Sequence, residues 1–352
     1  MKLVVILGAG ASADFGVPTL RPLFREAYAV RYLAKNKWLA EHLQHIFWGP
    51  RGHTLNTSDK SLTVEEMLTL LRDWEKQSSI PKLFSTAELA KFRKSIFTLI
   101  YQALYFGKSS DGRFLNPLIE FADKQSDHTT WASFNWDCIF ESSFWYCMGA
   151  NPSVVVKLNG LYPGRRKHTY LKLHGSLNWW AIKNQLTYVM FGNSGSLAAR
   201  WKAYDESDEI TDMPVLLEPS YYKYQDELYT QLLPQWKFFL ERLVDADYVL
   251  VIGYSLPSAD SEARCKMLSA FQVNQKSCWG VIDSSKETID RYERLFGTKR
   301  FRSFPSSLVA FNSNFYVNFK QLFPAFTPKP VAAVALPAPP VIPKTPGPGT
   351  KP

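Results

Sequence analysis

Two polar segments of this chain contain the side chains best suited to chemistry, and each directly follows a short apolar run. The first is SFNWD at residues 133–137, and the second is KLHGSLNW at residues 172–179. Because a histidine ordinarily has a pKa of about 6.5, His174 can take a proton from water or a hydroxyl group at neutral pH. The Asn135 amide can hydrogen-bond such a reactant while remaining neutral, and the Asp137 carboxylate can orient Asn135 or favour a cation. We interpret these three side chains as candidate catalytic residues.

Each of the three also has a structural interpretation. A single histidine is often a satisfied core residue, and Asn135 alone would be a turn residue at the end of a strand. Asp137 alone would cap a helix expected over Cys138–Tyr146, because a carboxylate at that position accepts a hydrogen bond from a backbone N–H group. The presence of both polar segments at strand ends favours a site, since ligands of open α/β sheets bind there.

A glycine-rich loop near the N-terminus is the second chemical signal. The apolar run Leu3–Leu7 continues directly into GAGASA at residues 8–13, which fits the pattern G-x-G-x-x-A before a helix. Small residues allow the backbone to turn sharply and to approach a pyrophosphate, and the helix N-terminus favours an anion. The candidate cofactor-binding residues of this loop are Gly8, Ala9, Gly10 and Ser12. The alternative interpretation is a tight structural turn.

One part of the usual dinucleotide pattern is missing from this region. An acidic residue is expected about twenty residues after the glycines, at the end of a second strand. Residues 22–33 instead predict a helix, which weakens an NAD-dehydrogenase interpretation. Asp283, which follows the apolar run Trp279–Ile282, is the candidate replacement and would hydrogen-bond the adenosine hydroxyls.

The elements that must position these residues are predicted by hydrophobic patterning. Nearly continuous apolar runs are typical of strands in a parallel sheet that is covered on both faces. Such runs lie at Leu3–Leu7, Trp131–Phe134, Tyr170–Leu173, Tyr248–Ile252, Trp279–Ile282 and Leu308–Phe311. Helical spacing is found at Thr63–Leu71, Ala87–Tyr105 and Pro234–Leu243, the last with Pro234 at the first helical position. The predicted fold class is α/β, a Rossmann-like open, mainly parallel sheet with helices on both faces and a large helical insertion.

The chain is expected to contain one domain at residues 1–325, with a helical insertion at about 30–125 and a second insertion at about 181–230. Residues 326–352 are expected to form a flexible, proline-rich tail. Nine of the twenty-five residues from Pro328 to Pro352 are proline, a composition that favours an extended, polyproline-like segment. This tail could be a linker, a docking peptide or a plain disordered terminus.

Composition excludes several classes of protein. Of the 352 residues, 46% are apolar, 15% aromatic and 21% charged, which is typical of a globular protein and excludes a disordered chain, a coiled coil and a collagen-like fibre. No run reaches the roughly 18–20 apolar residues of a membrane span. The apolar run at the N-terminus is too short for a signal peptide. We therefore expect a cytoplasmic protein without membrane association.

Charge and cysteine content narrow the choice further. The 41 Lys and Arg residues exceed the 32 Asp and Glu residues by +9, an excess too dispersed for a nucleic-acid-binding surface. Direct nucleic-acid binding is therefore not expected. The four cysteines form no C-x-x-C pair, so we expect neither a structural zinc nor any other metal.

Taken in order, these segments resemble the sirtuin-like (silent information regulator) family. The glycine loop and GVPTLR at residues 16–21 match its nucleotide loop, GAGxS followed by G-[IV]-P-x-[FLW]. The segments at 133–137 and 172–179 resemble its T-x-N-x-D and K-L-H-G-S-[IL]-x-W motifs, and VIGYSL at residues 251–256 resembles its G-x-S segment. The matching blocks cover residues 3–21, 129–180 and 247–283. The resemblance adds Pro18, Thr19, Arg21, Gly253 and Ser255 to the cofactor-binding candidates.

The resemblance implies chemistry on NAD+, which would be a substrate and not a permanently bound cofactor. Nicotinamide in NAD+ is a cationic leaving group, so its bond to ribose can break without an acid. The developing oxocarbenium ion would be met by Asn135, Asp137 and a nucleophile deprotonated by His174. Whether that nucleophile is water or a ribose hydroxyl stays open, and so does a linear or cyclic product.

Two departures bear on the activity that the resemblance implies. Deacylating sirtuins carry two C-x-x-C pairs and a glutamine before the catalytic asparagine, whereas this chain has no such pairs and has Phe134 at that position. The chain is instead similar to a bacterial sirtuin-like branch that hydrolyses NAD+ in anti-phage defence. This predicts an NAD+ glycohydrolase that is controlled by a regulatory or sensor partner protein, by homo-oligomerisation, or by both. The alternatives are a non-catalytic subunit that senses NAD+ or ADP-ribose, and a protein deacylase or ADP-ribosyltransferase.

Overall fold

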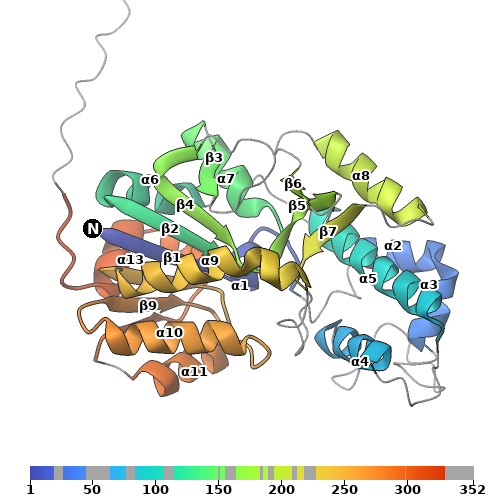
Figure 1. Cartoon of the computed structure of the whole chain (residues 1–352). Helices are drawn as coiled ribbons and strands as arrows, with labels where there is room; N and C mark the ends of the chain where they lie inside the picture. The colour runs from blue at the N-terminus through green and yellow to red at the C-terminus, as the bar shows by residue number, and fades with distance from the viewer. Residues whose placement is uncertain are drawn as a thin grey trace, which may run out of the picture.

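A seven-stranded sheet forms the centre of the fold, which we describe from a computed structural model (Figure 1). The structure describes residues 1–19, 27–44, 64–76, 84–106, 115–149, 151–154, 164–182, 185–188, 194–207, 212–217, 227–297 and 299–329. The strand order is β10-β9-β8-β1-β2-β4-β3, and each neighbouring pair is parallel. The strands are β1 (Lys2–Leu7), β2 (His128–Ser133), β3 (Asn151–Val154), β4 (Gly164–Lys172), β8 (Tyr248–Ile252), β9 (Cys278–Ile282) and β10 (Phe301–Phe304). The predicted α/β fold class is confirmed.

Strand β1 lies at the middle of the sheet and is buried along almost its whole length. Its sequence KLVVIL is apolar at five consecutive positions, and all five are buried. Leu7 pairs with Ser133 of β2 on one side and with Ile252 of β8 on the other. This register brings the loops after β1, β2 and β8 to the same edge of the sheet.

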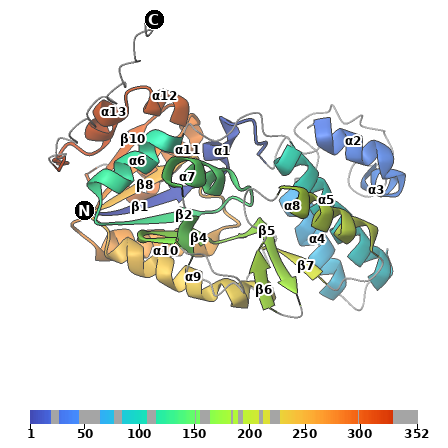
Figure 2. The ribbon, with the colours of Figure 1, turned by 90° about the horizontal axis from the view of Figure 1, so that it is seen from above.

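Two hydrophobic cores cover the two faces of the sheet, as the continuous apolar runs predict. Leu3, Val5 and Leu7 contribute to one core, whereas Val4 and Ile6 contribute to the other. Helices α6 (Asn116–Gln125), α7 (Ile139–Met148), α12 (Leu308–Asn312) and α13 (Phe315–Leu322) cover the first face. Helices α9 (Glu227–Val244), α10 (Ser261–Val273) and α11 (Lys286–Phe296) supply the second core (Figure 2).

A helical region follows β1 and lies beside the main sheet. It contains α1 (Ala9–Ala13), α2 (Ala27–Lys35), α3 (Lys37–His42), α4 (Val64–Lys76) and α5 (Thr86–Phe106). A second region contains β5 (Gly175–Ile182), β6 (Gln185–Tyr188), β7 (Asp212–Leu216) and α8 (Ser194–Glu206), with the strands in an antiparallel sheet ordered β6-β5-β7. The two regions pack together, since Tyr101 of α5 stacks on Trp201 of α8 with ring centroids 4.6 Å apart. Helices α2–α5 and the second region lie to the right of the main sheet in Figure 1, whereas α1 lies against the sheet.

Two local predictions are wrong. Leu308–Phe311 is not a strand but the helix α12, because the Ser307 side chain accepts a hydrogen bond from the Ala310 N–H group and starts a helical turn. The edge strand β10 lies a few residues earlier, at Phe301–Phe304. Pro234 is not at the start of its helix, since α9 begins at Glu227 and contains the proline in its interior.

The C-terminal part of the described chain packs onto the fold as far as Lys329. Phe326 is buried and its ring lies 5.4 Å from that of Phe121. The backbone N–H group of Lys329 donates to the Gln125 side chain over 2.7 Å. The predicted flexible tail lies outside the described residues from position 330 onward. None of the helices in the described part of the chain combines the length and apolarity needed to cross a bilayer.

Candidate active site

A cavity of about 670 Å³ opens at the carboxyl ends of the central strands. Its wall contains residues that follow β1, β2, β4, β8 and β9, the edge at which open α/β sheets bind ligands. The predicted site residues on this wall are Ala9, Gly10, Pro18, Thr19, Asn135, Asp137, His174, Gly253, Ser255 and Asp283. The fold therefore brings together segments that are far apart in the sequence.

Three of the predicted site residues are not found on the cavity wall. Gly8 and Ser12 are not among the wall residues. Ser12 is buried behind the wall, where its hydroxyl accepts a hydrogen bond of 3.0 Å from the Asn135 side chain. Arg21 lies outside the described residues.

The glycine loop after β1 packs tightly against the loop after β8. The Gly10 N–H group donates to the Gly253 carbonyl over 2.8 Å, and the Gly8 N–H group donates to the Ile252 carbonyl over 3.0 Å. A side chain on Gly8 would lie 2.4 Å from the Tyr254 Cα atom, and one on Gly253 would lie 2.2 Å from the Ala11 nitrogen. The close approach that these glycines permit is therefore between two loops of the protein. A bound phosphate would need groups other than the Gly8 and Gly10 amides.

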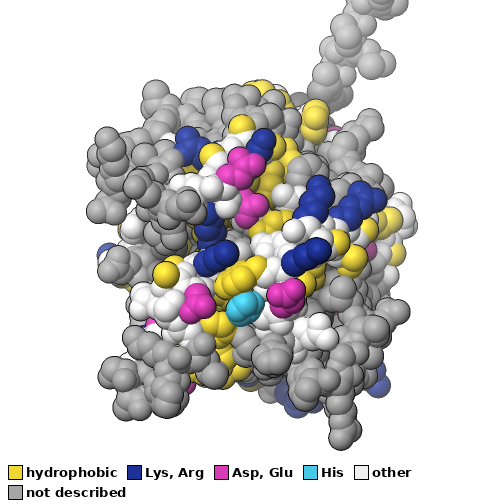
Figure 3. All heavy atoms as spheres, turned by 90° about the vertical axis from the view of Figure 1, so that its right-hand side faces the viewer, with side chains coloured by type: hydrophobic (Ala, Val, Ile, Leu, Met, Phe, Trp, Pro, Cys, Tyr) yellow, Lys and Arg dark blue, Asp and Glu magenta, His cyan; other side chains and the backbone are white. Residues whose placement is uncertain are grey.

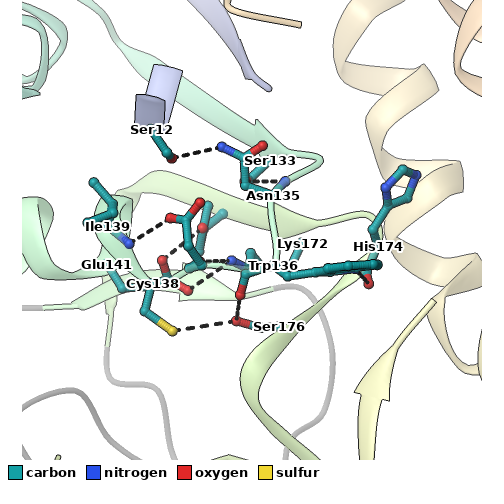
Figure 4. A network of polar contacts seen from close by, with 12 residues as sticks. Ser12, Ser133, Asn135, Trp136, Cys138, Ile139, Glu141, Lys172, His174 and Ser176 are labelled. Carbon is teal, nitrogen blue, oxygen red and sulfur yellow. Dashed lines mark hydrogen bonds and ion pairs between the residues drawn. The ribbon is translucent and has the colours of Figure 1, made fainter. Parts of the chain in front are cut away.

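Asn135 connects the end of β2 to the glycine loop. Its side-chain Nδ2 donates to the Gly8 carbonyl over 2.8 Å. The same nitrogen donates to the Ser12 hydroxyl over 3.0 Å (Figure 4). Both contacts use the amide nitrogen. The Oδ1 atom is therefore the part of the amide with which Asn135 would accept a hydrogen bond from a ligand.

Asp137 contacts the start of helix α7 but is not its N-cap as the structural interpretation proposed, because the N-cap residue is Cys138. Its carboxylate oxygen Oδ1 accepts a hydrogen bond of 2.9 Å from the Ile139 N–H group. Asp137 is only 6% exposed yet belongs to the cavity wall. Its charge can therefore act on a bound cation while the side chain holds the end of the helix.

A buried ion pair lies behind the Asn135–Asp137 segment. The Lys172 ammonium lies 3.5 Å from Glu141 Oε1, and both side chains are almost completely buried. Lys172 Nζ also donates to the Asp137 carbonyl, and the Tyr170 hydroxyl donates to Glu141 Oε2 over 3.0 Å (Figure 4). Burial raises the pKa of Glu141, and the Lys172 charge acts in the opposite direction. Lys172 thus fixes the backbone beneath the cavity.

His174 is placed by backbone contacts and aromatic rings. Its carbonyl accepts hydrogen bonds from the Trp136 indole over 3.0 Å and from the Leu217 N–H group over 2.9 Å. Its imidazole packs edge-on against Phe134, with ring centroids 5.1 Å apart. In Figure 4 the Asn135 side chain is directed toward Ser12, while the imidazole lies on the far side of Trp136. Asn135 and His174 thus line one cavity from two separate positions on its wall.

Asp283 lies at the opposite end of the cavity, directly after β9. Its Oδ1 atom accepts a hydrogen bond of 2.8 Å from the Ser285 N–H group. Partial burial raises the pKa of Asp283, and the hydrogen bond from Ser285 limits that rise. The Oδ2 atom is the one left to accept a hydrogen bond from a ligand hydroxyl.

Four further residues belong to the site but were not among the predicted site residues. Tyr254, Asp260 and Arg264 follow β8 on the cavity wall, and Trp136 lies between Asn135 and Asp137. The sequence offered one signal for them, since Asp260 is an acidic residue in the loop after the predicted strand Tyr248–Ile252, where open α/β sheets bind ligands. Arg264 and Arg291 are the basic residues among those that line the cavity. The face in Figure 3 mixes Lys and Arg with Asp and Glu side chains, with apolar groups between them.

Among the described residues, no three His, Cys, Asp or Glu side chains are placed together to hold a metal ion. Burial also raises the pKa of the Cys138 thiol to about 12, which makes Cys138 a poor metal ligand and nucleophile.

These features define an α/β protein with a doubly wound parallel sheet and a polar cavity at its topological switch point, beside β1. Comparison with protein-family models found no match, and comparison with curated proteins found none either.

Solved structures similar to this chain include several Sir2 proteins. A mutant Sir2 homologue in complex with 2'-O-acetyl ADP ribose is 13% identical with a TM-score of 0.46, and the match covers 91% of this chain and 93% of that chain. Sir2 with a p53 peptide and NAD+ is 10% identical with a TM-score of 0.45, covering 91% and 93%. Another mutant Sir2 homologue, in complex with ADP ribose, is 13% identical with a TM-score of 0.44, covering 92% and 94%. At these identities and TM-scores, the likeness supports no conclusion about activity.

Proposed function

We propose that this protein is an NAD+ glycohydrolase that cleaves the bond between nicotinamide and ribose, releasing nicotinamide and ADP-ribose. The observation that carries the proposal is the order of polar groups along the cavity. Asp283 follows β9, Ser255 follows β8, Asn135 follows β2 and His174 follows β4. Because neighbouring strands are roughly 4.8 Å apart, β9 and β4 are separated by roughly 19 Å, a span suited to an extended dinucleotide.

In this arrangement the adenosine would lie at the Asp283 end, where the carboxylate accepts hydrogen bonds from ribose hydroxyls. The two phosphates would lie near Arg264 and Arg291, whose charges complement them. Thr19 and Ser255 supply further polar groups to this part of the wall. The nicotinamide ribose would then lie between Asn135 and His174.

The reaction that suits this placement needs few protein groups. The bond from ribose C1' to the nicotinamide nitrogen breaks, and its electron pair leaves with nicotinamide, which becomes neutral. Water bonds to C1' and gives its proton to His174. The Asn135 Oδ1 atom would orient the water or a ribose hydroxyl, and the negative charge of Asp137 would favour the cationic transition state.

Nicotinamide release by purified protein incubated with NAD+ tests this function. We expect His174→Ala to slow release by about 10²–10⁴-fold, the usual contribution of a general base, and Asn135→Ala to remove most activity. His128→Gln is the matched control, because His128 lies at the opposite end of β2. Full activity in both site variants would overturn the assignment.

A second candidate function is a subunit that binds NAD+ or ADP-ribose without cleaving it. The hydrogen bonds from Asn135 Nδ2 to Gly8 and Ser12 favour this alternative, because they give the amide a structural role. Intact NAD+ recovered from a tight complex, with and without candidate partner proteins, would support sensing. Release of nicotinamide would support hydrolysis. A deacylase or ADP-ribosyltransferase would instead require an acyl-lysine or acceptor protein in the assay.

We also propose, from the sequence resemblance, that this activity serves a bacterial anti-phage system in the cytoplasm, where NAD+ depletion would stop an infected cell. A sensor partner or self-assembly would control it. Cellular NAD+ should fall during phage infection of cells that carry the protein and its genetic neighbours, and should stay constant when the protein carries His174→Ala.

A further inference from the structure

Asp260 is a buried acid at the start of helix α10 whose side chain does not cap that helix. It occupies the N-cap position and is 4% exposed, yet its carboxylate accepts no hydrogen bond from the helix. An N-cap aspartate ordinarily accepts one from the backbone N–H groups of the first turn. Here Oδ2 accepts a hydrogen bond of 2.7 Å from the Tyr254 hydroxyl, and Oδ1 lies 3.3 Å from His174 Nε2. The carboxylate is therefore directed at the candidate general base.

Tyr254 holds this carboxylate from a fixed position. Its ring stacks on Phe134 with centroids 4.0 Å apart and an interplanar angle of 7°. Its carbonyl accepts a hydrogen bond of 2.9 Å from the Tyr292 hydroxyl. Phe134 thus contacts both the tyrosine that holds Asp260 and the imidazole that Asp260 faces.

The loop that carries Asp260 adopts an unusual backbone conformation. Among the described residues, Leu256 is the one non-glycine residue with a positive φ, at 53°. Such a conformation costs roughly 1–2 kcal/mol for a residue with a side chain. Leu256 is also fully buried. Packing therefore maintains a strained turn that delivers Asp260 to the cavity.

Two aromatic rings lie beside the His174 imidazole. Besides Phe134, the Trp236 ring lies 6.2 Å away. The charged residues on the same cavity wall are Glu66, Asp137, Asp260, Arg264, Asp283, Glu287 and Arg291. Of these charged residues, Asp260 is the one that lies at ion-pair distance from the His174 ring.

We propose that Asp260 is a positioning residue: its negative charge, at ion-pair distance from His174 Nε2, favours a proton on that atom and so leaves Nδ1 to accept a proton from the nucleophile. The Asp260 charge then stabilises the imidazolium that forms, and Tyr254 keeps the carboxylate in place. The catalytic consequence rests on the proposed function, whereas the Asp260–His174 contact belongs to the protein without ligand.

The kinetic test compares Asp260→Asn with Asp290→Asn, a control on α11 whose side chain is not on the cavity wall. Asp260→Asn should lower kcat for nicotinamide release by about 10²-fold or more, within the range of acid–base effects, with KM nearly unchanged. In a His174→Gln background, Asp260→Asn should cause no further loss, because it acts through the imidazole. An equal loss in both backgrounds, or no loss in either, would overturn the proposal.

A second test does not depend on activity. Ring ¹⁵N shifts of histidine-labelled protein, assigned with His174→Gln, report the tautomer and pKa of His174. We expect the Nε2–H tautomer in the unaltered protein and a His174 pKa at least about one unit lower in Asp260→Asn, because a nearby carboxylate favours the charged ring. An unchanged tautomer and pKa would refute the contact. If the unaltered protein released no nicotinamide, the proposed function would fail while this measurement still decided the role of Asp260.

Tyr254→Phe provides a variant that keeps the carboxylate, in case Asp260→Asn does not fold. Without the hydroxyl donor, Asp260 Oδ2 loses its 2.7 Å hydrogen bond, and the carboxylate presents more negative charge to the ring. The His174 pKa should therefore rise. A His174 pKa unaffected by Tyr254→Phe would contradict the chain of contacts from Tyr254 through Asp260 to His174.

Discussion

The indole Nε1 of Trp136 donates a hydrogen bond of 3.0 Å to the backbone carbonyl of His174. In return, the Trp136 carbonyl accepts a hydrogen bond of 2.9 Å from the Leu177 N–H group. The loop after β2 is therefore joined both to His174, which follows β4, and to Leu177 of β5. Because Trp136 follows Asn135 directly in the chain, these bonds fix the relative positions of the two candidate catalytic residues through the backbone.

Replacing Trp136 should disturb catalysis more than stability. Trp136→Phe keeps most of the buried ring but removes the indole donor, and the His174 carbonyl retains its bond from Leu217. We expect a loss of about 1 kcal/mol in the free energy of unfolding, typical of one hydrogen bond, and at least a tenfold loss in nicotinamide release, about 1.4 kcal/mol in barrier height. Urea unfolding and initial rates measure the two effects. Trp145→Phe, on an exposed part of α7, should change neither.

Breaking the buried ion pair should destabilise the fold in a pH-dependent way. Lys172→Met leaves Glu141 buried without its cation, which should cost about 3–5 kcal/mol at neutral pH. Burial raises the pKa of Glu141, and loss of Lys172 raises it further. The folded variant therefore binds a proton that the unfolded chain has lost above its usual pKa of 4.5, so stability should increase as pH falls toward that value.

Thermal unfolding of Lys172→Met between pH 5 and 8 measures this slope. The double variant Lys172→Met/Glu141→Gln should recover part of the loss and lose the pH dependence. Lys202→Met, which removes an exposed pair with Glu206, should change stability by less than about 1 kcal/mol. If the stability of Lys172→Met did not depend on pH, protonation of Glu141 would not be the cause of the destabilisation.

Asp283 should control binding of the adenosine end. Removing the carboxylate with Asp283→Ala should weaken ADP-ribose binding by about 10- to 150-fold, which corresponds to a charged hydrogen bond of about 1.5–3 kcal/mol. Because burial raises the pKa of Asp283, affinity should fall as pH drops through a range above the ordinary aspartate pKa. Calorimetric titration at several pH values measures both effects. Asp283→Asn should bind weakly at every pH, and an affinity equal to that of the unaltered protein would exclude this role.

Gly253 and Gly149 form a matched pair that separates backbone strain from steric conflict. Their φ angles are 60° and 62°, but a Cβ atom on Gly253 would lie 2.2 Å from the Ala11 nitrogen, whereas one on Gly149 would have no neighbour within 4 Å. Gly149→Ala should cost roughly 1–2 kcal/mol of strain. Gly253→Ala should exceed that loss by about 1–3 kcal/mol, as overpacking does, and should also weaken ADP-ribose binding. Equal shifts in Tm for Gly149→Ala and Gly253→Ala would show that the loops after β1 and β8 can move apart without a loss of stability.

Hydrophobic patterning predicted the interior strands because their residues are buried on both faces. It failed for Leu308–Phe311, where a Ser307 cap decides the structure. The parallel strand prediction placed the polar segments at the ends of strands, whereas their order along the sheet edge is known from the structure. The proposed role of Asp260 could not be predicted from the sequence, because it depends on a loop conformation that directs an N-cap carboxylate away from its own helix. Trp136 likewise gained its role from a long-range contact to His174 that no local pattern encodes.

The interlocked glycine loops have a consequence for how the sequence of this protein can vary. Each loop occupies the space that a side chain on the other would require. Substitutions at positions 8–11 and 253–254 are therefore interdependent, and natural variants should change at both places together or at neither. Covariation between these two distant segments would be a signature of this fold that is independent of its chemistry.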